Sequence, residues 1–303
     1  MEFGMILPNG WRGELADLAP RARWDAVLRA GALAEELGFD SIWAYDHALL
    51  EPGTAPAGEA SAELVFEPFV LLAALAARTS RVRLGQLVSN AALRPPGYLA
   101  HLVRSLVAVA GGRVVLGIGA GWNADEHEHL DVPFPSAPER VEALDRSIAR
   151  VVGRLAGQER PTVLVGGGGE RGTLRVAARL ADWADFGGTP SLADFEHKSR
   201  VLADHCTAIG RDFDDIVRVA HFDCLLAPGE AELADRLAAV QAAGYRRDAA
   251  TAALIGTPDE VAEALRLWQG AGCRYAILYF ADTISGNSPR LFASQVAPRL
   301  RAA

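Results

Sequence analysis

The sequence predicts a (β/α)8 barrel, the TIM-barrel class of α/β fold, as a single domain over residues 1–303. Short β-rich runs alternate with longer amphipathic runs along the whole chain, and eight such units fill it without remainder. The length also suits this class, because an ordinary barrel takes about 250 residues. An open doubly wound sheet would show a similar alternation, but the count of eight favours the barrel.

Each predicted strand is a short apolar run bounded by turn residues, and the first ends at Pro8-Asn9-Gly10. The strands are residues 3–7, 41–44, 82–88, 114–118, 162–165, 183–186, 217–226 and 275–280. Each predicted helix spaces its apolar residues at the helical period; Gly38 ends the first, and Pro96 opens a later one. The helices are residues 24–37, 66–79, 96–110, 139–155, 173–181, 192–209, 231–243 and 258–269, with a last one starting near residue 289.

Composition excludes several classes of function. The net charge of −8 leaves no basic field for nucleic acid. Three widely spaced cysteines form no CxxC pair, so we expect buried thiols instead of a zinc knuckle or disulfides. No apolar stretch is long enough for a membrane span, and the N-terminus lacks the basic region of a signal peptide. We therefore expect a cytoplasmic protein that binds neither membranes nor nucleic acid.

Active sites of barrels lie at the carboxyl ends of the strands, so the residues after each predicted strand are the candidates. The sharpest signal is Gly166-Gly167-Gly168-Gly169 after the fifth strand, followed by a helix that starts at Thr173. Glycines allow close approach to a ligand, and the amides of a helix N-terminus suit a phosphate, to which Thr173 could add its hydroxyl. The alternative is a flexible turn without a ligand. The G-x-G-x-x-G match in this run is weak, because any glycine run meets it.

Two further strand ends carry chemistry. His47 can transfer a proton near neutral pH, and the adjacent carboxylate of Asp46 could orient it. After the fourth strand, Gly119 and Gly121 form a second close-approach loop, in which Trp122 is either one wall of a slot for a flat ring or a buried packing residue. The polar loop at residues 47–63 is long for a compact barrel and is therefore a functional candidate.

A metal site and a serine nucleophile are not predicted. The run Glu126-His127-Glu128-His129 offers nitrogen and oxygen donors, but it is more typical of a solvated loop or helix face. The sequence has no G-x-S-x-G elbow.

Several segments together carry a family resemblance over about residues 1–280. They are residues 37–43 followed by Asp46-His47, 66–68, 72–85, 111–113, 116–122 with Glu126, 133–135, 139–140, 166–171, 173–174, 177–182 and 256–261. On these motifs the chain resembles the bacterial-luciferase-like superfamily, and specifically its coenzyme F420-dependent oxidoreductases. The sequence departs from that pattern at residues 103–110 and 183–188, and at Trp122, where some F420 dehydrogenases have Glu.

The resemblance implies a deazaflavin ring lying over the strand ends, with its phosphate on the loop after the fifth strand and hydride transfer to or from a small organic substrate. It implies a homodimer and a non-prolyl cis peptide near Val88-Ser89-Asn90. The expected catalytic residues are His47, Asp46 and Trp122. The expected cofactor-binding residues are Asn9, Ser89, Asn90, Gly119, Gly121, Gly166, Gly167, Gly168, Gly169, Thr173, Gly187 and Gly188.

Two alternatives remain open at this point. The departures from the pattern would allow FMN in place of F420, in a reduced-flavin monooxygenase of the same superfamily. They would also allow a cofactor-binding protein without turnover on a degenerate barrel.

Overall fold

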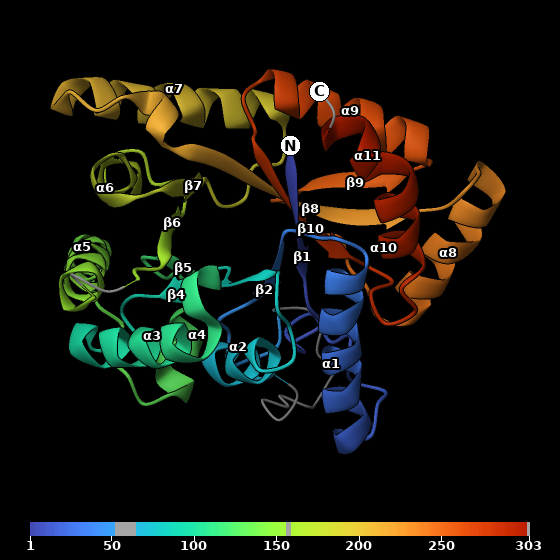
Figure 1. Cartoon of the computed structure of the whole chain (residues 1–303), viewed down its shortest axis with the longest axis horizontal. Coiled ribbons are helices and arrows are strands. Elements are labelled where there is room, and N and C mark those ends of the chain that lie inside the picture. Colours follow the sequence, from blue (N-terminus) through green and yellow to red (C-terminus); the bar gives the residue numbers. More distant parts are fainter. Residues whose placement is uncertain (52–64, 156–158, 302–303) are drawn as a thin grey trace.

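The computed structural model describes residues 1–51, 65–155 and 159–301. Eight parallel strands close into a barrel with helices around it, which confirms the predicted fold class (Figure 1). The barrel strands are β1 (Glu2–Ile6), β2 (Ser41–Ala44), β3 (Arg83–Gln86), β5 (Val114–Gly119), β6 (Thr162–Gly166), β7 (Trp183–Asp185), β8 (Val217–Leu226) and β10 (Tyr275–Phe280). Pairing of β10 with both β1 and β8 closes the ring.

Two short strands differ from the prediction. The strand predicted at residues 82–88 is shorter, because β3 ends at Gln86, and an unpredicted two-residue strand, β4 (Ser89–Asn90), follows it and pairs with β5. The Leu87–Val88 peptide between them is cis, next to the segment for which the resemblance implied such a bond. A further strand, β9 (Ala252–Gly256), was not predicted; it pairs with the carboxyl-terminal half of β8. Its sequence, Ala-Ala-Leu-Ile-Gly, is short and holds one β-branched residue, so it lacks the composition typical of a strand.

Most predicted helices lie within a few residues of their expected bounds, and α3 and α7 match them. The helices are α1 (Pro20–Glu36), α2 (Pro68–Ala76), α3 (Pro96–Ala110), α4 (Ala124–His129), α5 (Ala137–Arg154), α6 (Thr173–Leu180), α7 (Leu192–Ile209), α8 (Glu230–Ala242), α9 (Pro258–Gly270), α10 (Asn287–Leu291) and α11 (Ala297–Arg301). Short 3-10 turns lie at Gly111–Arg113 and Phe213–Asp215, and a π turn at Phe292–Val296. Proline in the first turn and capping boxes at Ser136 and Thr257 define the starts of α5 and α9.

Aromatic side chains fill the inside of the barrel. Trp43, Trp183 and Tyr275 pack there with aliphatic residues of the other strands. Trp43 fits because its neighbours include glycines: a Cβ at Gly85 would overlap the Trp43 ring. A second, larger core lies between the strands and the helices. The filled interior leaves the strand ends as the place for a ligand.

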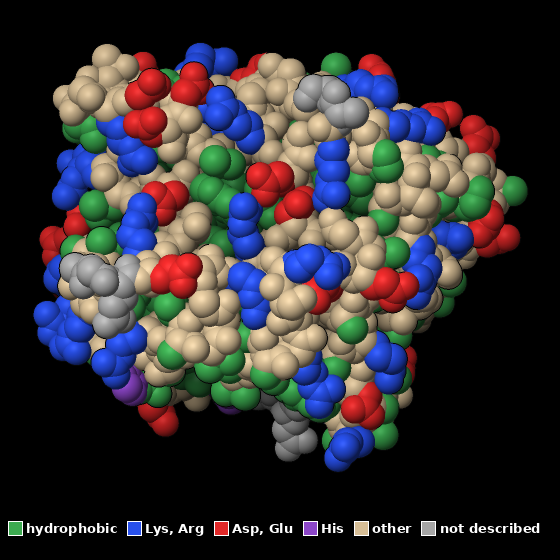
Figure 2. Space-filling view, viewed as in Figure 1, with side chains coloured by type: hydrophobic (Ala, Val, Ile, Leu, Met, Phe, Trp, Pro, Cys, Tyr) green, Lys and Arg blue, Asp and Glu red, His purple; other side chains and the backbone are tan. Residues whose placement is uncertain are grey.

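The surface and the thiols agree with the composition. On the face in Figure 2, basic and acidic side chains are interspersed. All three cysteines are buried and free, as expected. Among the helices of the described segments, none has the length and apolar character of a membrane span. Most of the predicted functional loop at residues 47–63 lies outside the described residues, which end at 51 and resume at 65.

Candidate functional site

A cavity of about 330 Å³ lies at the carboxyl ends of the strands. Eleven of the predicted site residues line it: Asp46, His47, Asn90, Gly119, Gly121, Trp122, Gly166, Gly167, Thr173, Gly187 and Gly188. They come from five strand ends that are distant in sequence. The barrel rule therefore brought most of the predicted set to one place.

Four predicted residues lie outside this lining. Asn9 is buried, and its amide donates to the carbonyl of Tyr45 at 2.9 Å, so that it ties the β1 and β2 ends together. Ser89 is fully buried in β4. Gly168 and Gly169 continue the glycine loop; a Cβ at Gly168 would lie 2.7 Å from the Phe186 carbonyl oxygen.

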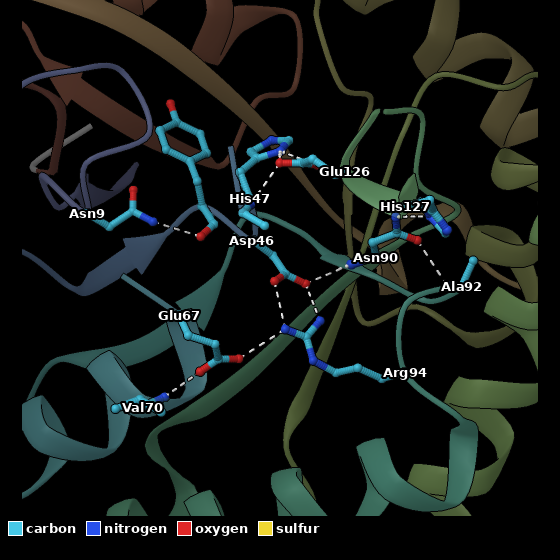
Figure 3. A network of polar contacts seen from close by, with 12 residues as sticks. Asn9, Asp46, His47, Glu67, Val70, Asn90, Ala92, Arg94, Glu126 and His127 are labelled. Atoms are coloured by element: carbon cyan, nitrogen blue, oxygen red, sulfur yellow. Dashed lines mark hydrogen bonds and ion pairs between the residues drawn. The ribbon is translucent and has the colours of Figure 1, made fainter. Parts of the chain in front are cut away.

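His47 is held by Glu126. Its Nδ1 lies 2.9 Å and 3.0 Å from the two carboxylate oxygens of Glu126 (Figure 3). Oε1 of Glu126 also accepts from the amides of Ala48 and Leu49. Glu126 is only 2% exposed. The interpretation of its segment as solvated is wrong for Glu126 and for His127, because the short helix α4 turns both inward and leaves Glu128 outside. His127 bonds to the Pro133 carbonyl and to the Asn90 amide.

The expectation that Asp46 orients His47 is also corrected. Asp46 instead accepts from both terminal nitrogens of Arg94, at 2.5 Å and 2.8 Å, and from the amide of Asn90 (Figure 3). Side chains of successive residues in an extended segment point to opposite sides, so neighbours in sequence diverge here. Arg94 also forms an ion pair with Glu67. Through its ion pair with Asp46, it links the ends of β2 and β4.

Aromatic rings surround the imidazole. Trp11 stacks on His47 with ring centroids 4.1 Å apart and an angle of 13°. Trp122 meets His47 edge-on at 5.9 Å and is 61% exposed, so it is a wall of the cavity and not a buried packing residue. Trp11 was not predicted as a site residue, because its loop carries no motif. Among the described residues, its indole nitrogen is buried without a partner.

The glycine loop lies against the segment that contains the cis peptide. A Cβ at Gly166 would be 2.7 Å from a methyl group of Val88, so only glycine allows this approach. Gly167 has φ of +128°, a conformation that other residues rarely adopt. Within the described residues, no side chain caps the N-terminus of α6, and Thr173 of its first turn lines the cavity. The loop thus presents backbone groups and a hydroxyl to a ligand.

Two pairs of polar side chains were not predicted. Asp185 at the end of β7 pairs with His221 of β8, and both line the cavity. Beside the cavity, Arg12 pairs with Asp223 and lies over the ring of Tyr279. The sequence offers little signal for either, because His221 and Asp223 stand inside an apolar strand. In the segments that the structure describes, no three His, Cys, Asp or Glu residues form a metal-binding group.

Known proteins share sequence similarity with this chain. Residues 1–251 match the family described as luciferase-like monooxygenase. An F420-dependent glucose-6-phosphate dehydrogenase of Microbacterium testaceum is 28% identical over 91% of this chain and 93% of its own. A protein of the same name from Beutenbergia cavernae is 36% identical, but over 52% of this chain and 44% of its own.

Solved structures share the fold. Monooxygenase RslO1 of Streptomyces bottropensis superposes with a TM-score of 0.78 at 23% identity, over 99% of this chain and all of its own. The F420-dependent tetrahydromethanopterin reductase of Methanopyrus kandleri superposes with a TM-score of 0.72 at 17% identity, over 98% of both chains. Because the family match covers most of the sequence, the chain belongs to the luciferase-like monooxygenase family.

Proposed function

We propose that the protein is an F420-dependent oxidoreductase that transfers hydride between the deazaflavin and a small organic substrate. One observation carries the proposal: a single cavity joins a carboxylate-held histidine, His47, to a glycine loop that ends at the N-terminus of α6. The full-length relative named as F420-dependent supports the choice of cofactor.

The residues present fit such a cofactor. Gly166 and Gly167 leave the loop without side chains, and the uncapped α6 start with Thr173 would hold its phosphate. The exposed Trp122 gives the cavity an aromatic wall suited to a flat ring. When bound, the deazaflavin would accept or supply the hydride.

His47 would accept or donate the proton that accompanies this hydride transfer. When Nδ1 donates to Glu126, the neutral imidazole leaves Nε2 as an acceptor. That nitrogen would take the hydroxyl proton of an alcohol during oxidation and return it to a carbonyl oxygen during reduction. Glu126 is then the positioning residue that fixes the tautomer.

The lining favours an uncharged substrate. Among the cavity residues that the structure describes, none is Lys or Arg, whereas Asp46, Glu126 and Asp185 are carboxylates. Residues 52–64 contain no Lys or Arg in sequence either. Because the glycine loop and the α6 N-terminus are assigned to the cofactor phosphate, a phosphate dianion on the substrate would lack a guanidinium or ammonium partner here. We therefore propose an uncharged alcohol or carbonyl compound, and not the sugar phosphate in the relatives' names.

Binding and turnover test the proposal. Purified protein is titrated with F420 and with FMN while cofactor fluorescence is followed, and then supplied with alcohols, ketones and glucose 6-phosphate. We expect F420 binding and turnover of an uncharged compound, lost in His47→Gln with binding retained. FMN binding without F420 binding would support the monooxygenase alternative. Binding without turnover in either protein would support a carrier, and oxidation of glucose 6-phosphate would refute the substrate class.

Assembly and location complete the proposal. We propose a homodimer, in line with the family resemblance, and a cytoplasmic location, in line with the composition. Light scattering on the eluting protein should give twice the 32.2 kDa of the chain; a mass of one chain would refute the dimer.

A further inference from the structure

A second histidine–carboxylate pair faces the cavity from a different wall. His221 Nδ1 lies 2.9 Å from Oδ2 of Asp185, and the two side chains are 17% and 3% exposed. Their strands, β7 and β8, are neighbours in the barrel. In the ring order, β7 is four strands from β2, which carries His47 into the site. In an eight-stranded barrel that separation places the two pairs on opposite sides.

The Asp185–His221 pair is bonded directly to the glycine loops. The backbone carbonyl of Asp185 accepts from the amide of Gly167 at 2.8 Å. Its second carboxylate oxygen accepts from the amide of Gly187 at 3.0 Å. The pair therefore lies on the side of the cavity whose glycine loops we assign to the cofactor, across from His47.

The surroundings of His221 favour the imidazolium. Burial lowers the pKa of His221, but the carboxylates that face it, Asp185 first and then Asp223 and Asp248, raise the pKa above its ordinary value. The second ring nitrogen has only a long contact within the described residues: the Thr251 hydroxyl donates to Asp248 at 2.7 Å, and its oxygen lies 3.4 Å from His221 Nε2, beyond the usual range of about 2.7–3.2 Å, so an Nε2 proton remains available to a ligand. The described lining contains no Lys or Arg, so a protonated His221 would supply positive charge beside the glycine loops within that lining.

We propose that His221, held by Asp185, donates a hydrogen bond to the pyrimidine edge of the bound cofactor ring and favours its reduced form. Reduction places negative charge on that edge of a deazaflavin or flavin, and a neighbouring cation tunes the electronics of such a ring. The inference rests on the proposed function. It assigns His221 to tuning the cofactor and leaves proton transfer with the substrate to His47.

The test compares affinities for the two redox states without any turnover. Dissociation constants of oxidised and reduced F420 are measured for the wild type, His221→Gln and Asp185→Asn, with the exposed His101→Gln as the matched control. We expect His221→Gln to weaken binding of reduced F420 about tenfold more than binding of oxidised F420, the loss of one charge-assisted hydrogen bond. The control should change neither. Equal weakening of both states, or none, would overturn the inference.

The pH dependence gives a second readout that a purely structural role would not change. The preference of the wild type for reduced F420 should decline as the pH rises through the His221 pKa. The ring's own titration is shared by both proteins, so this decline should be absent in His221→Gln. If that variant fails to fold, the His221 ring-nitrogen NMR signals of the wild type decide: a shift on adding F420 supports contact, and no shift refutes it. A wild type that binds neither F420 nor FMN refutes the proposed function itself.

Discussion

Replacing Glu126 by glutamine would reverse the tautomer of His47. The carboxylate accepts from His47 Nδ1 and from the amides of Ala48 and Leu49, at 2.8 Å for the Ala48 amide. Glutamine has the same shape but only one acceptor oxygen. If that oxygen keeps the backbone amides, the NH2 group takes the place of the second oxygen, 3.0 Å from Nδ1, and two facing N–H donors disfavour a proton on that nitrogen. The proton moves to Nε2, and the nitrogen proposed to accept the substrate proton becomes a donor.

The size of the effect follows from the bond that is lost. A hydrogen bond to a charged group contributes about 1.5–3 kcal/mol. At about 1.4 kcal/mol per factor of ten, that is about a 10- to 150-fold change in the tautomer equilibrium. Because Glu126 is buried, the free energy of unfolding of Glu126→Gln should fall by a similar amount, about 1.5–3 kcal/mol.

Ring-nitrogen NMR of the histidines at a pH where His47 is neutral measures the tautomer, and urea unfolding measures the stability. The signals of His47 are assigned by their disappearance in His47→Gln. Glu128→Gln is the matched control, since Glu128 lies on the same helix but is exposed. If Glu126→Gln retains the wild-type tautomer and stability, then Glu126 does not orient His47, and the reasoning fails.

Three further predictions concern the loop, a buried ion pair and acid stability. Gly167→Ala forces alanine to φ of +128°, so we expect F420 binding to weaken about tenfold in a titration and the free energy of unfolding in urea to fall by about 1–3 kcal/mol. Gly153→Ala is the control: Gly153 lies on α5 with open space around it, so its replacement should raise the free energy of unfolding by about 0.5–1 kcal/mol. Arg94→Met leaves Asp46 buried and unpaired and should cost about 3–5 kcal/mol in urea unfolding, where a loss below about 1 kcal/mol would contradict the burial argument. Partial burial raises the pKa of Glu35, but hydrogen bonds from the amides of residues 80–82 outweigh this effect and lower the pKa to about 2. Its folded pKa lies below the ordinary 4.5, so its stabilisation is present above pH 4.5 and is lost as the pH falls toward 2; urea midpoints of Glu35→Gln should show less decline over that window, and parallel curves would refute the assignment.

The barrel and the edge at which the site lies could both be predicted from the sequence. Hydrophobic runs of strand length alternate with helical spacing, and this local pattern indicates the eight barrel strands before their partners are known. His47, Trp122 and the glycines follow strands directly, so the barrel rule was enough to bring them into one cavity.

Only the tertiary structure decided which side chains pair. Glu126 is 79 residues from His47, Arg94 is 48 from Asp46, and His221 is 36 from Asp185. Such pairs depend on strand register, on the inward turn of α4 and on which side of the chain each residue faces. Adjacent residues diverge in an extended segment, which is why Asp46 contacts Arg94 while Glu126 holds His47. An ionisable side chain inside an apolar strand, such as His221, has no local signature, because the carboxylate that compensates its burial comes from the neighbouring strand.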